Sequence, residues 1–247
     1  MGSGVRRLGV LVGESDQVVE YDLQRFLPPG VSFHVARLDQ PKGSKVADPA
    51  SLAIMAGSAP ATALKVLPAD PEFFLFACTS ASFFKGPGWD RAVARSISDA
   101  TGVPATTTAT LVAEAFAALS VARIFMVTPY PDQANESEIA FLASAGITVE
   151  GLWSFGCRYS AEVPVIPPEE IKASILEQAA AIRACDGLLI SCTMLRAVEI
   201  TEDLEAALGV PIVTSNSASL WGSLRALGVP YDSVSAGRLF RLDEQKS

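Results

Sequence analysis

Histidine is almost absent from this chain: among its 247 residues only His34 is a histidine. This scarcity excludes a metal site built from several histidines, and it makes Ser-His-Asp or Cys-His catalysis depend on one side chain. His34 lies inside the apolar segment 31–35, where a structural role is the simpler interpretation. The chain also has no CxxC pair and no close cysteine spacing, so we expect free thiols and no metal (Cys78, Cys157, Cys185, Cys192).

Clustered positive charge and long apolar segments are missing as well. The formal net charge is −8 and the isoelectric point is about 4.8, with no run of Lys and Arg that could hold a phosphate backbone. No apolar stretch reaches the roughly 18 residues of a membrane span, and residues 1–5 lead into a strand without the apolar region of a signal peptide. We therefore expect a cytoplasmic protein that binds a small molecule, and neither a nucleic acid nor a membrane.

A glycine-rich phosphate loop is the third missing feature. After the first apolar segment the chain reads Gly13-Glu14-Ser15-Asp16, with one glycine and two acids where a dinucleotide fingerprint would have GxGxxG. We therefore expect that no dinucleotide binds there and that the protein needs no cofactor.

Short apolar segments alternate with longer helical patterns along the chain, which is 49% hydrophobic. This alternation predicts an α/β fold with parallel sheets, whose sites form at the carboxyl ends of the strands. The predicted strands are 8–12, 32–38, 73–77, 105–108, 124–128, 148–153, 187–191 and 212–214. The predicted helices are 18–26, 49–67, 89–101, 110–119, 132–145, 168–184, 202–208 and 217–227. Glycines stand where four of these helices should end (Gly102, Gly146, Gly209, Gly228).

Three landmarks repeat in the same order about half a chain apart. An apolar run of strand length ends at Cys78 and again at Cys192, the opening strand 5–12 has an echo at 121–128, and a Gly-Val-Pro turn occurs at 102–104 and 209–211. These repeats predict two pseudo-symmetric Rossmann-like lobes that face each other across an active-site cleft. We place the lobe carrying Cys78 at residues 1–114 and 216–247, and the lobe carrying Cys192 at residues 115–215.

Two facing thiols can act without histidine, metal or cofactor. One thiolate can remove a proton from carbon while the other thiol protonates the opposite face, which is racemisation. Alternatively, one thiolate can add to an activated double bond, allow rotation and leave again, which is cis-trans isomerisation. Both reactions need a lowered thiol pKa, which we expect from backbone N–H groups, the helix 89–101 and the segment after Thr193. For Cys157 and Cys185 we expect structural roles.

The cysteine pair and several short motifs resemble the aspartate/glutamate racemase superfamily. The similarity is greatest to its maleate cis-trans isomerase branch and runs almost end to end, through the motifs at 4–9, 86–88, 127–130, 190–192 and 236–239. Arylmalonate decarboxylases form a related branch that typically lacks the first cysteine. The resemblance implies an isomerase that converts maleate to fumarate through a covalent cysteine adduct, and a homodimer or larger homo-oligomer.

The resemblance also implies roles for individual residues. Cys78 would be the nucleophile that adds to the alkene, and Cys192 would donate and accept the proton. Tyr130 and the backbone N–H groups after both cysteines would hold the carboxylates of the substrate. The substrate-binding residues that we expect are Ser15, Asp16, Thr79, Ser80, Tyr130, Ser160, Thr193 and Met194.

Two departures from the maleate branch leave the substrate open. That branch usually has a Ser-Ser-Asn turn after the first strand, whereas this chain reads Glu14-Ser15-Asp16, with Asp16 in the place of the asparagine. It also has Ser160 where that branch usually has an asparagine. A carboxylate beside a dicarboxylate costs about 4 kcal/mol at 4 Å for an effective dielectric near 20. Asp16 would suit an ammonium group better, so a racemase of an amino acid or of an ammonium-bearing derivative is the alternative; Asp16 could also only cap the helix that begins near Val18. An arylmalonate-type decarboxylase and a non-catalytic ligand-binding protein are less favoured.

Overall fold

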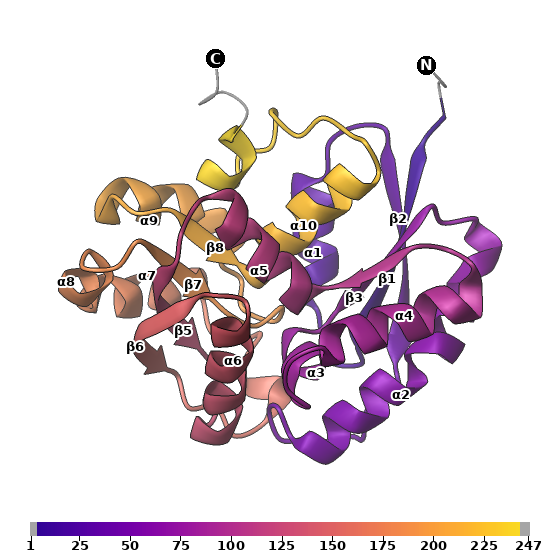
Figure 1. Ribbon diagram of the computed structural model, residues 1–247, viewed down its shortest axis with the longest axis horizontal. Coiled ribbons are helices and arrows are strands. Elements are labelled where there is room, and N and C mark those ends of the chain that lie inside the picture. Colours follow the sequence, from indigo (N-terminus) through magenta and orange to yellow (C-terminus); the bar gives the residue numbers. More distant parts are fainter. Residues whose placement is uncertain (1–3, 243–247) are drawn as a thin grey trace.

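The computed structural model describes residues 4–242 and contains two separate four-stranded sheets in which all strands are parallel (Figure 1). The first sheet has the order β2-β1-β3-β4, with β1 Arg6–Gly13, β2 Val31–Leu38, β3 Phe73–Ala77 and β4 Ala105–Thr107. The second has the order β6-β5-β7-β8, with β5 Arg123–Thr128, β6 Thr148–Ser154, β7 Gly187–Ile190 and β8 Ile212–Thr214. The strand orders are equivalent, which confirms the predicted α/β fold of two pseudo-symmetric lobes.

Both sheets are covered on their two faces, as parallel sheets require. The central strands β3 and β7 are almost completely buried. A glycine in each sheet leaves room for an aromatic ring of a neighbouring strand. A Cβ at Gly9 would lie 2.4 Å from the ring of Phe74, and one at Gly151 would lie 2.6 Å from the ring of Phe125. The two rings therefore fill their sheets in a similar way, although the second pair accompanies a register shift between β5 and β6.

The helices follow the strands in the order that the sequence predicts. In the first half they are α1 Val18–Phe26, α2 Pro49–Val66, α3 Thr79–Phe83, α4 Trp89–Thr101 and α5 Thr108–Ala118. In the second half they are α6 Asp132–Ser144, α7 Pro168–Glu177, α8 Ala179–Ile182, α9 Thr201–Leu208 and α10 Ser215–Ala226. Short 3-10 turns occupy η1 Leu67–Ala69, η2 Ser160–Glu162, η3 Val198–Ile200 and η4 Arg238–Arg241.

The predicted helix 168–184 is divided in two, because the backbone at Gln178 (φ −93°, ψ 8°) leaves the helical region and its N–H bonds to Ile175 O. The four glycines predicted at helix ends all have positive φ, between 64° and 81°. This conformation closes a helix and costs glycine little strain.

The segment Pro49–Ala69 corrects one expectation. It is helical over 21 residues with a mean hydropathy of 1.4, so by length and composition alone it could cross a membrane. In the structure its buried face, which includes Met55, Ala59 and Ala63, packs against β2 and α4. Burial against the first sheet accounts for this face of the helix, whereas Ile54 and Leu64 on the same helix are exposed.

Helices α5 and α10 lie side by side between the two sheets (Figure 1). They approach closely because Gly222 has no side chain: a Cβ there would lie 2.3 Å from Leu111. The hydroxyls of Thr108 and Ser219, one from each helix, are hydrogen-bonded at 2.9 Å. Although α10 follows β8 of the second sheet, it packs against β3 of the first sheet.

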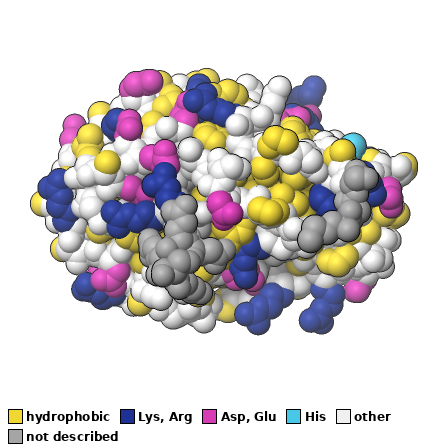
Figure 2. Space-filling view, turned by 90° about the horizontal axis from the view of Figure 1, so that it is seen from above, with side chains coloured by type: hydrophobic (Ala, Val, Ile, Leu, Met, Phe, Trp, Pro, Cys, Tyr) yellow, Lys and Arg dark blue, Asp and Glu magenta, His cyan; other side chains and the backbone are white. Residues whose placement is uncertain are grey.

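Charge on the surface is mixed. On the face shown in Figure 2, Lys and Arg side chains are spread among Asp and Glu. Several exposed ion pairs join the two kinds, such as Arg123 with Asp186 at 3.0 Å. The picture of this face agrees with the absence of a basic cluster in the sequence.

Candidate active site

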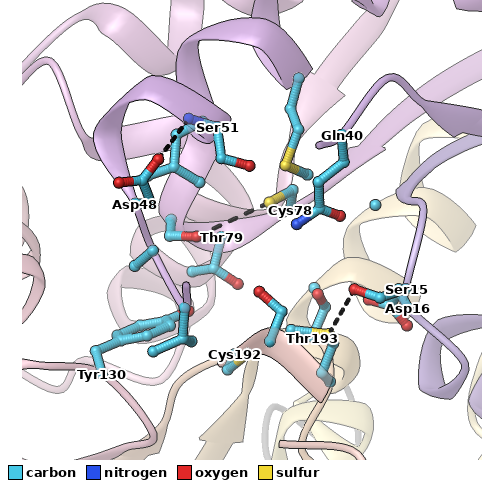
Figure 3. Close-up of a pocket in the computed structure, with 18 of the residues that line it drawn as sticks. Ser15, Asp16, Gln40, Asp48, Ser51, Cys78, Thr79, Tyr130, Cys192 and Thr193 are labelled. Atoms are coloured by element: carbon cyan, nitrogen blue, oxygen red, sulfur yellow. Dashed lines mark hydrogen bonds between the residues drawn. The ribbon is translucent and has the colours of Figure 1, made fainter. Parts of the chain in front are cut away.

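A small cavity of about 30 Å³ lies between the carboxyl ends of the two sheets, which is where parallel α/β sheets place their ligand sites. Loops of both halves of the chain line it, and the two cysteine-bearing loops face each other across it (Figure 3). The sequence predicted ten site residues, and all ten contribute to the lining: Ser15, Asp16, Cys78, Thr79, Ser80, Tyr130, Ser160, Cys192, Thr193 and Met194.

Cys78 follows β3 and is the residue that precedes helix α3. Its backbone is extended (φ −150°), and its carbonyl accepts a hydrogen bond of 2.6 Å from the Ser82 hydroxyl. Its thiol is partly exposed and lies 3.9 Å from the hydroxyl of Ser80. The sequence offered the helix 89–101 as a following helix whose N-terminal dipole could lower the pKa of this thiol. That prediction was wrong, because the unpredicted helix α3 begins directly after Cys78 and α4 starts only after Gly88.

Cys192 follows β7 and has an unusual backbone. Its φ is 112°, a value that favours glycine and strains other residues. The Cys192 N–H donates a hydrogen bond of 3.0 Å to the Ser215 hydroxyl, which in turn accepts one of 2.9 Å from the Thr79 hydroxyl. One hydroxyl at the start of α10 therefore links the two cysteine loops, and this link holds the strained residue in place.

Both thiols have raised pKa values, which overturns the expected lowering. Burial is the largest cause: it raises the pKa of Cys78 to about 11 and that of Cys192 well above its ordinary value. The backbone N–H groups of Ala81 and Met194 act in the opposite direction, on Cys78 and Cys192 respectively, but they are outweighed. Both thiols are therefore protonated at neutral pH, and formation of a thiolate must accompany the reaction.

Tyr130 comes from the end of β5 and is held rigidly. Its N–H donates to the Thr128 hydroxyl at 3.1 Å, while its carbonyl accepts from Asn135 at 3.1 Å and from Ser154 at 2.6 Å. The side chain is buried, and its hydroxyl is directed at Cys192. Burial, followed by the charge of Cys192, keeps the pKa of the phenol well above its usual range, so Tyr130 is a neutral hydrogen-bond donor.

Asp16 caps helix α1, as one interpretation of the sequence predicted. One carboxylate oxygen accepts hydrogen bonds from the N–H groups of Val18 at 2.9 Å and Val19 at 3.0 Å. The carboxylate also lines the cavity and interacts with the hydroxyl of Thr193. Burial raises the pKa of Asp16 and outweighs these stabilising contacts. The hydroxyl of the neighbouring Ser15 lies 3.9 Å from the sulfur of Met194, and both residues line the cavity.

Ser160 is positioned at the cavity by a backbone pairing between a segment of the first half of the chain and a segment of the second half. Residues 44–46 and 158–160 pair in antiparallel fashion around the bridge between Lys45 and Tyr159. The Ser160 N–H donates to Ser44 O at 3.1 Å, and the Val46 N–H donates to Arg158 O at 3.1 Å. These two segments therefore cover one side of the cavity and hold Ser160 there.

The β2–α2 connection and the first turns of helix α2 also line the cavity, and the sequence did not predict their contribution. The lining residues that it overlooked here are Gln40, Lys45, Val46, Ala47, Asp48, Ser51, Leu52 and Met55. The strand-end rule could have found Gln40, because it lies two residues beyond the end of β2. The others stand too far from a strand end for that rule.

Two buried carboxyl groups lie behind the Cys192 loop. Glu138 of α6 accepts a hydrogen bond of 2.6 Å from the hydroxyl of Ser191, and burial raises its pKa to about 8. Asp22 of α1 accepts one of 2.7 Å from Asn216, whose amide also donates to Thr193 O at 2.9 Å. Burial raises the pKa of Asp22 to about 7. Asn216 therefore supports the loop from behind.

The remaining candidates lie away from the cavity. Cys185 is buried in the core below α8, and Cys157 lines a neighbouring groove. His34 lies within β2 and is not part of the cavity lining. Within residues 4–242, no group of three or more His, Cys, Asp and Glu side chains is arranged to hold a metal ion.

The comparisons with known proteins agree with this geometry. The Amdase family, described as arylmalonate decarboxylase, matches residues 60–240. A maleate isomerase of Nocardia farcinica is 30% identical over 97% of this chain and 97% of its own length. This chain belongs to the family of maleate isomerases and arylmalonate decarboxylases. Within that family, an arylmalonate decarboxylase of Bordetella bronchiseptica is 32% identical over 61% of this chain and 62% of its own length.

Solved structures of the family have the same fold. A cysteine-to-serine variant of the Nocardia farcinica maleate cis-trans isomerase, with a covalently bound succinylcysteine intermediate, superimposes with a TM-score of 0.88 at 27% identity. The match covers 96% of this chain and 99% of that chain. The two-lobed architecture is therefore shared over almost the whole of both chains.

Proposed function

We propose that this protein is a cofactor-independent cis-trans isomerase that converts maleate to fumarate through a covalent adduct on Cys78. The observation that carries the proposal is the placement of Cys78 and Cys192 at equivalent strand ends of the two lobes, on opposite sides of one cavity. The full-length similarity to a maleate isomerase supports it.

The geometry supports a stepwise addition and elimination. The Cys78 sulfur passes its proton to a carboxylate of the bound maleate, which returns it when the thiolate is released at the end of the cycle, and the sulfur bonds to one alkene carbon while the π electron pair moves to the second carbon and into its carboxylate. The Cys192 thiol then protonates that second carbon, which gives a succinyl thioether. After rotation about the new single bond, the Cys192 thiolate removes a proton, the double bond reforms in the trans geometry and the carbon–sulfur bond breaks. No electrons are gained or lost overall.

Binding roles follow from the lining of the cavity. We infer that the neutral hydroxyl of Tyr130 and the backbone N–H groups of Thr79 and Ser80 hold one carboxylate. The N–H groups of Thr193 and Met194 hold the other, and Ser15 and Ser160 add hydroxyls. These donors carry no positive charge, so the preorganised dipoles must stabilise the charge that develops on the substrate.

Asp16 favours a second candidate function. Its carboxyl group lines the cavity beside Thr193, where an ammonium group could pair with it. A racemase of an amino acid or of an ammonium-bearing derivative is therefore the alternative, with each thiol acting on one face of the α-carbon. Exchange of the α-proton in deuterated water, with no turnover of maleate, would favour this alternative. Cys78 argues against an arylmalonate-type decarboxylase, and the facing thiols argue against a purely ligand-binding role.

We further propose the division of the chain that the sequence indicated, with residues 1–114 and 216–247 in one lobe and 115–215 in the other. Residues 1–3 and 243–247 of this division lie outside the described part of the chain. The packing of α10 on β3 supports it. A cytoplasmic location, a homodimer or larger homo-oligomer and independence from metals and cofactors stay predictions.

Mass spectrometry tests the proposed function directly. The Cys192→Ser variant, incubated with maleate and digested, should carry a succinyl adduct on the peptide that contains Cys78. The Cys157→Ser variant is the matched control, because Cys157 is partly exposed but lies outside the cavity. An adduct on Cys157, or none on Cys78 together with no formation of fumarate by the wild type, would refute the proposal.

A further inference from the structure

Gln40 places an unsatisfied amide in the catalytic cavity. Its side chain extends from the connection after β2 to a position beside Cys78 (Figure 3). Its Oε1 is buried without a hydrogen-bond partner, while its Nε2 is turned toward Cys78 (Figure 3) and, among residues 4–242, donates to no other side chain. A Cβ at Gly13 would lie 3.4 Å from Oε1, an ordinary van der Waals distance, so the amide lies directly against the backbone of Gly13.

A buried amide without a partner is unfavourable, since it has lost its hydrogen bonds to water. Met55 and Leu52 nearby show that the wall accepts apolar side chains. Packing alone would therefore be satisfied by leucine or methionine at position 40. A polar group that the protein leaves free at the edge of a reaction cavity is available to a ligand.

The partner of this amide can be inferred from the surrounding charges. Asp16 has one oxygen committed to the cap of α1, and as an acid it cannot donate a hydrogen bond when it is ionised. The turn after β1 therefore offers no amide donor to a carboxylate. Gln40 approaches the same space from the next strand of the sheet, because β1 and β2 are neighbours.

We propose that the Gln40 side-chain amide is a specificity residue that donates its N–H to the substrate carboxylate next to the carbon attacked by Cys78. It supplies the donor that Asp16 cannot supply. The inference rests on the proposed function and names the residue that makes a dicarboxylate acceptable in a cavity that contains Asp16. Gln40 binds and orients the substrate and takes no part in proton transfer.

Two variants test the role of the amide. Gln40→Met keeps the length of the side chain and removes both polar atoms, while Gln40→Glu replaces the donor by an anion. We expect Gln40→Met to raise the KM for maleate and the Kd for succinate, a saturated dicarboxylate that cannot be attacked, by about 10- to 100-fold. The kcat should change less, and Gln40→Glu should weaken binding further. Gln133→Leu, an exposed change in the neighbouring groove, is the control and should leave both constants unchanged.

The outcomes separate this inference from the proposed function. Wild-type turnover of maleate together with unaltered succinate binding by Gln40→Met would overturn the inference and leave the proposed function standing. If the wild type neither converts maleate nor binds succinate, the proposed function fails. The role of Gln40 is then tested by another measurement. Malonate, glutamate and acetate are each added, and the rate at which iodoacetamide alkylates Cys78 is compared between the wild type and Gln40→Met. Equal protection of the wild type and Gln40→Met, or no protection of the wild type, would overturn it.

Discussion

The two cysteine loops occupy equivalent places in the two lobes, yet their local structures differ. The Cys78 loop has an extended backbone, opens into helix α3 and leaves its thiol partly exposed to the cavity. The Cys192 loop has a strained backbone at φ 112°, buries its thiol and is held through its N–H by Ser215. An accessible thiol suits a nucleophile that must bond to carbon, whereas a buried and fixed thiol suits proton transfer over a short path.

The surroundings of the loops differ in the same direction. The residues on either side of Cys192 are bound to buried polar groups, Ser191 to Glu138 and Thr193 to Asn216 with Asp22 behind it. The Cys78 loop is held by hydroxyls of its own helix and by Ser215. The two loops thus share the position of the thiol at the end of a strand, while the groups behind the thiol differ.

The largest expected effect comes from removing each thiol in turn. Cys78→Ser and Cys192→Ser should each lower kcat by about a thousandfold or more, since serine is nearly isosteric but a far weaker nucleophile and acid. The comparison predicts different intermediates: Cys192→Ser should accumulate the adduct, and Cys78→Ser should form none. Steady-state kinetics with mass spectrometry checks both statements. Retention of most activity by either variant would show that two thiols are not required.

The buried acid behind Cys192 should be visible in the pH dependence of stability. The pKa of Glu138 is raised from 4.5 to about 8, so its contribution is fully present below pH 4.5 and is lost as pH rises through 8. Glu138→Gln mimics the protonated acid and should remove this loss, which amounts to a few kcal/mol at about 1.4 kcal/mol per pH unit. Urea unfolding at pH 5 and pH 8.5 measures it. The exposed Glu136→Gln on the same helix is the control, and an equal effect of both variants would contradict the prediction.

Asp16 influences both thiols, so its substitution tests whether the loops respond alike. Asp16→Asn keeps a capping oxygen and removes a charge that raises the pKa of Cys78 and of Cys192. If Asp16 also contacts the substrate, dicarboxylates should bind more tightly and ammonium-bearing ligands more weakly, by about 1 to 3 kcal/mol each. Inhibition constants for succinate and for a small amino acid distinguish the cases. Unchanged constants would mean that Asp16 acts only as a cap.

The smallest expected effect concerns the backbone itself. The free energy of unfolding of the Cys192→Gly variant should exceed that of Cys192→Ala by about 1 kcal/mol, because a φ of 112° strains any residue that has a Cβ. At position 78 the Cys78→Ala variant should be the more stable one by about 0.5–1 kcal/mol. The backbone there is extended, so glycine relieves no strain, and glycine loses more conformational entropy on folding than alanine does. Urea unfolding of the four variants gives both differences. The same order at both positions would remove the backbone contrast between the loops.

The sequence predicted most elements well because local pattern and tertiary packing agree there. The bounds of β3, β8, α1 and α4 are those that the pattern predicted. Helix α3 was missed because Thr79–Phe83 is a short run with weak helix formers, and all five of its residues are buried by the surrounding fold. The strain at Cys192 was also invisible, since the residue type that would signal positive φ is absent there.

The candidate site was predicted to a similar extent and for a similar reason. Residues at strand ends, such as Cys78, Tyr130 and Cys192, could be placed in one cavity from topology alone. The resemblance to the family added Ser160. The raised thiol pKa values could not be predicted, because they depend on how completely distant segments exclude water. Gln40 was not predicted, because what distinguishes it is a buried amide oxygen without a hydrogen-bond partner, which only the structure reveals.

The position of α10 has a consequence for how the chain folds. This helix completes the packing of β3 although it is synthesised after the second sheet, and one continuous hydrophobic core includes Leu75, Ile190 and Trp221. A half-length fragment would leave its share of that core in water. The two lobes should therefore unfold together in one cooperative transition, so the spacing of the thiols is secured by the stability of the whole chain.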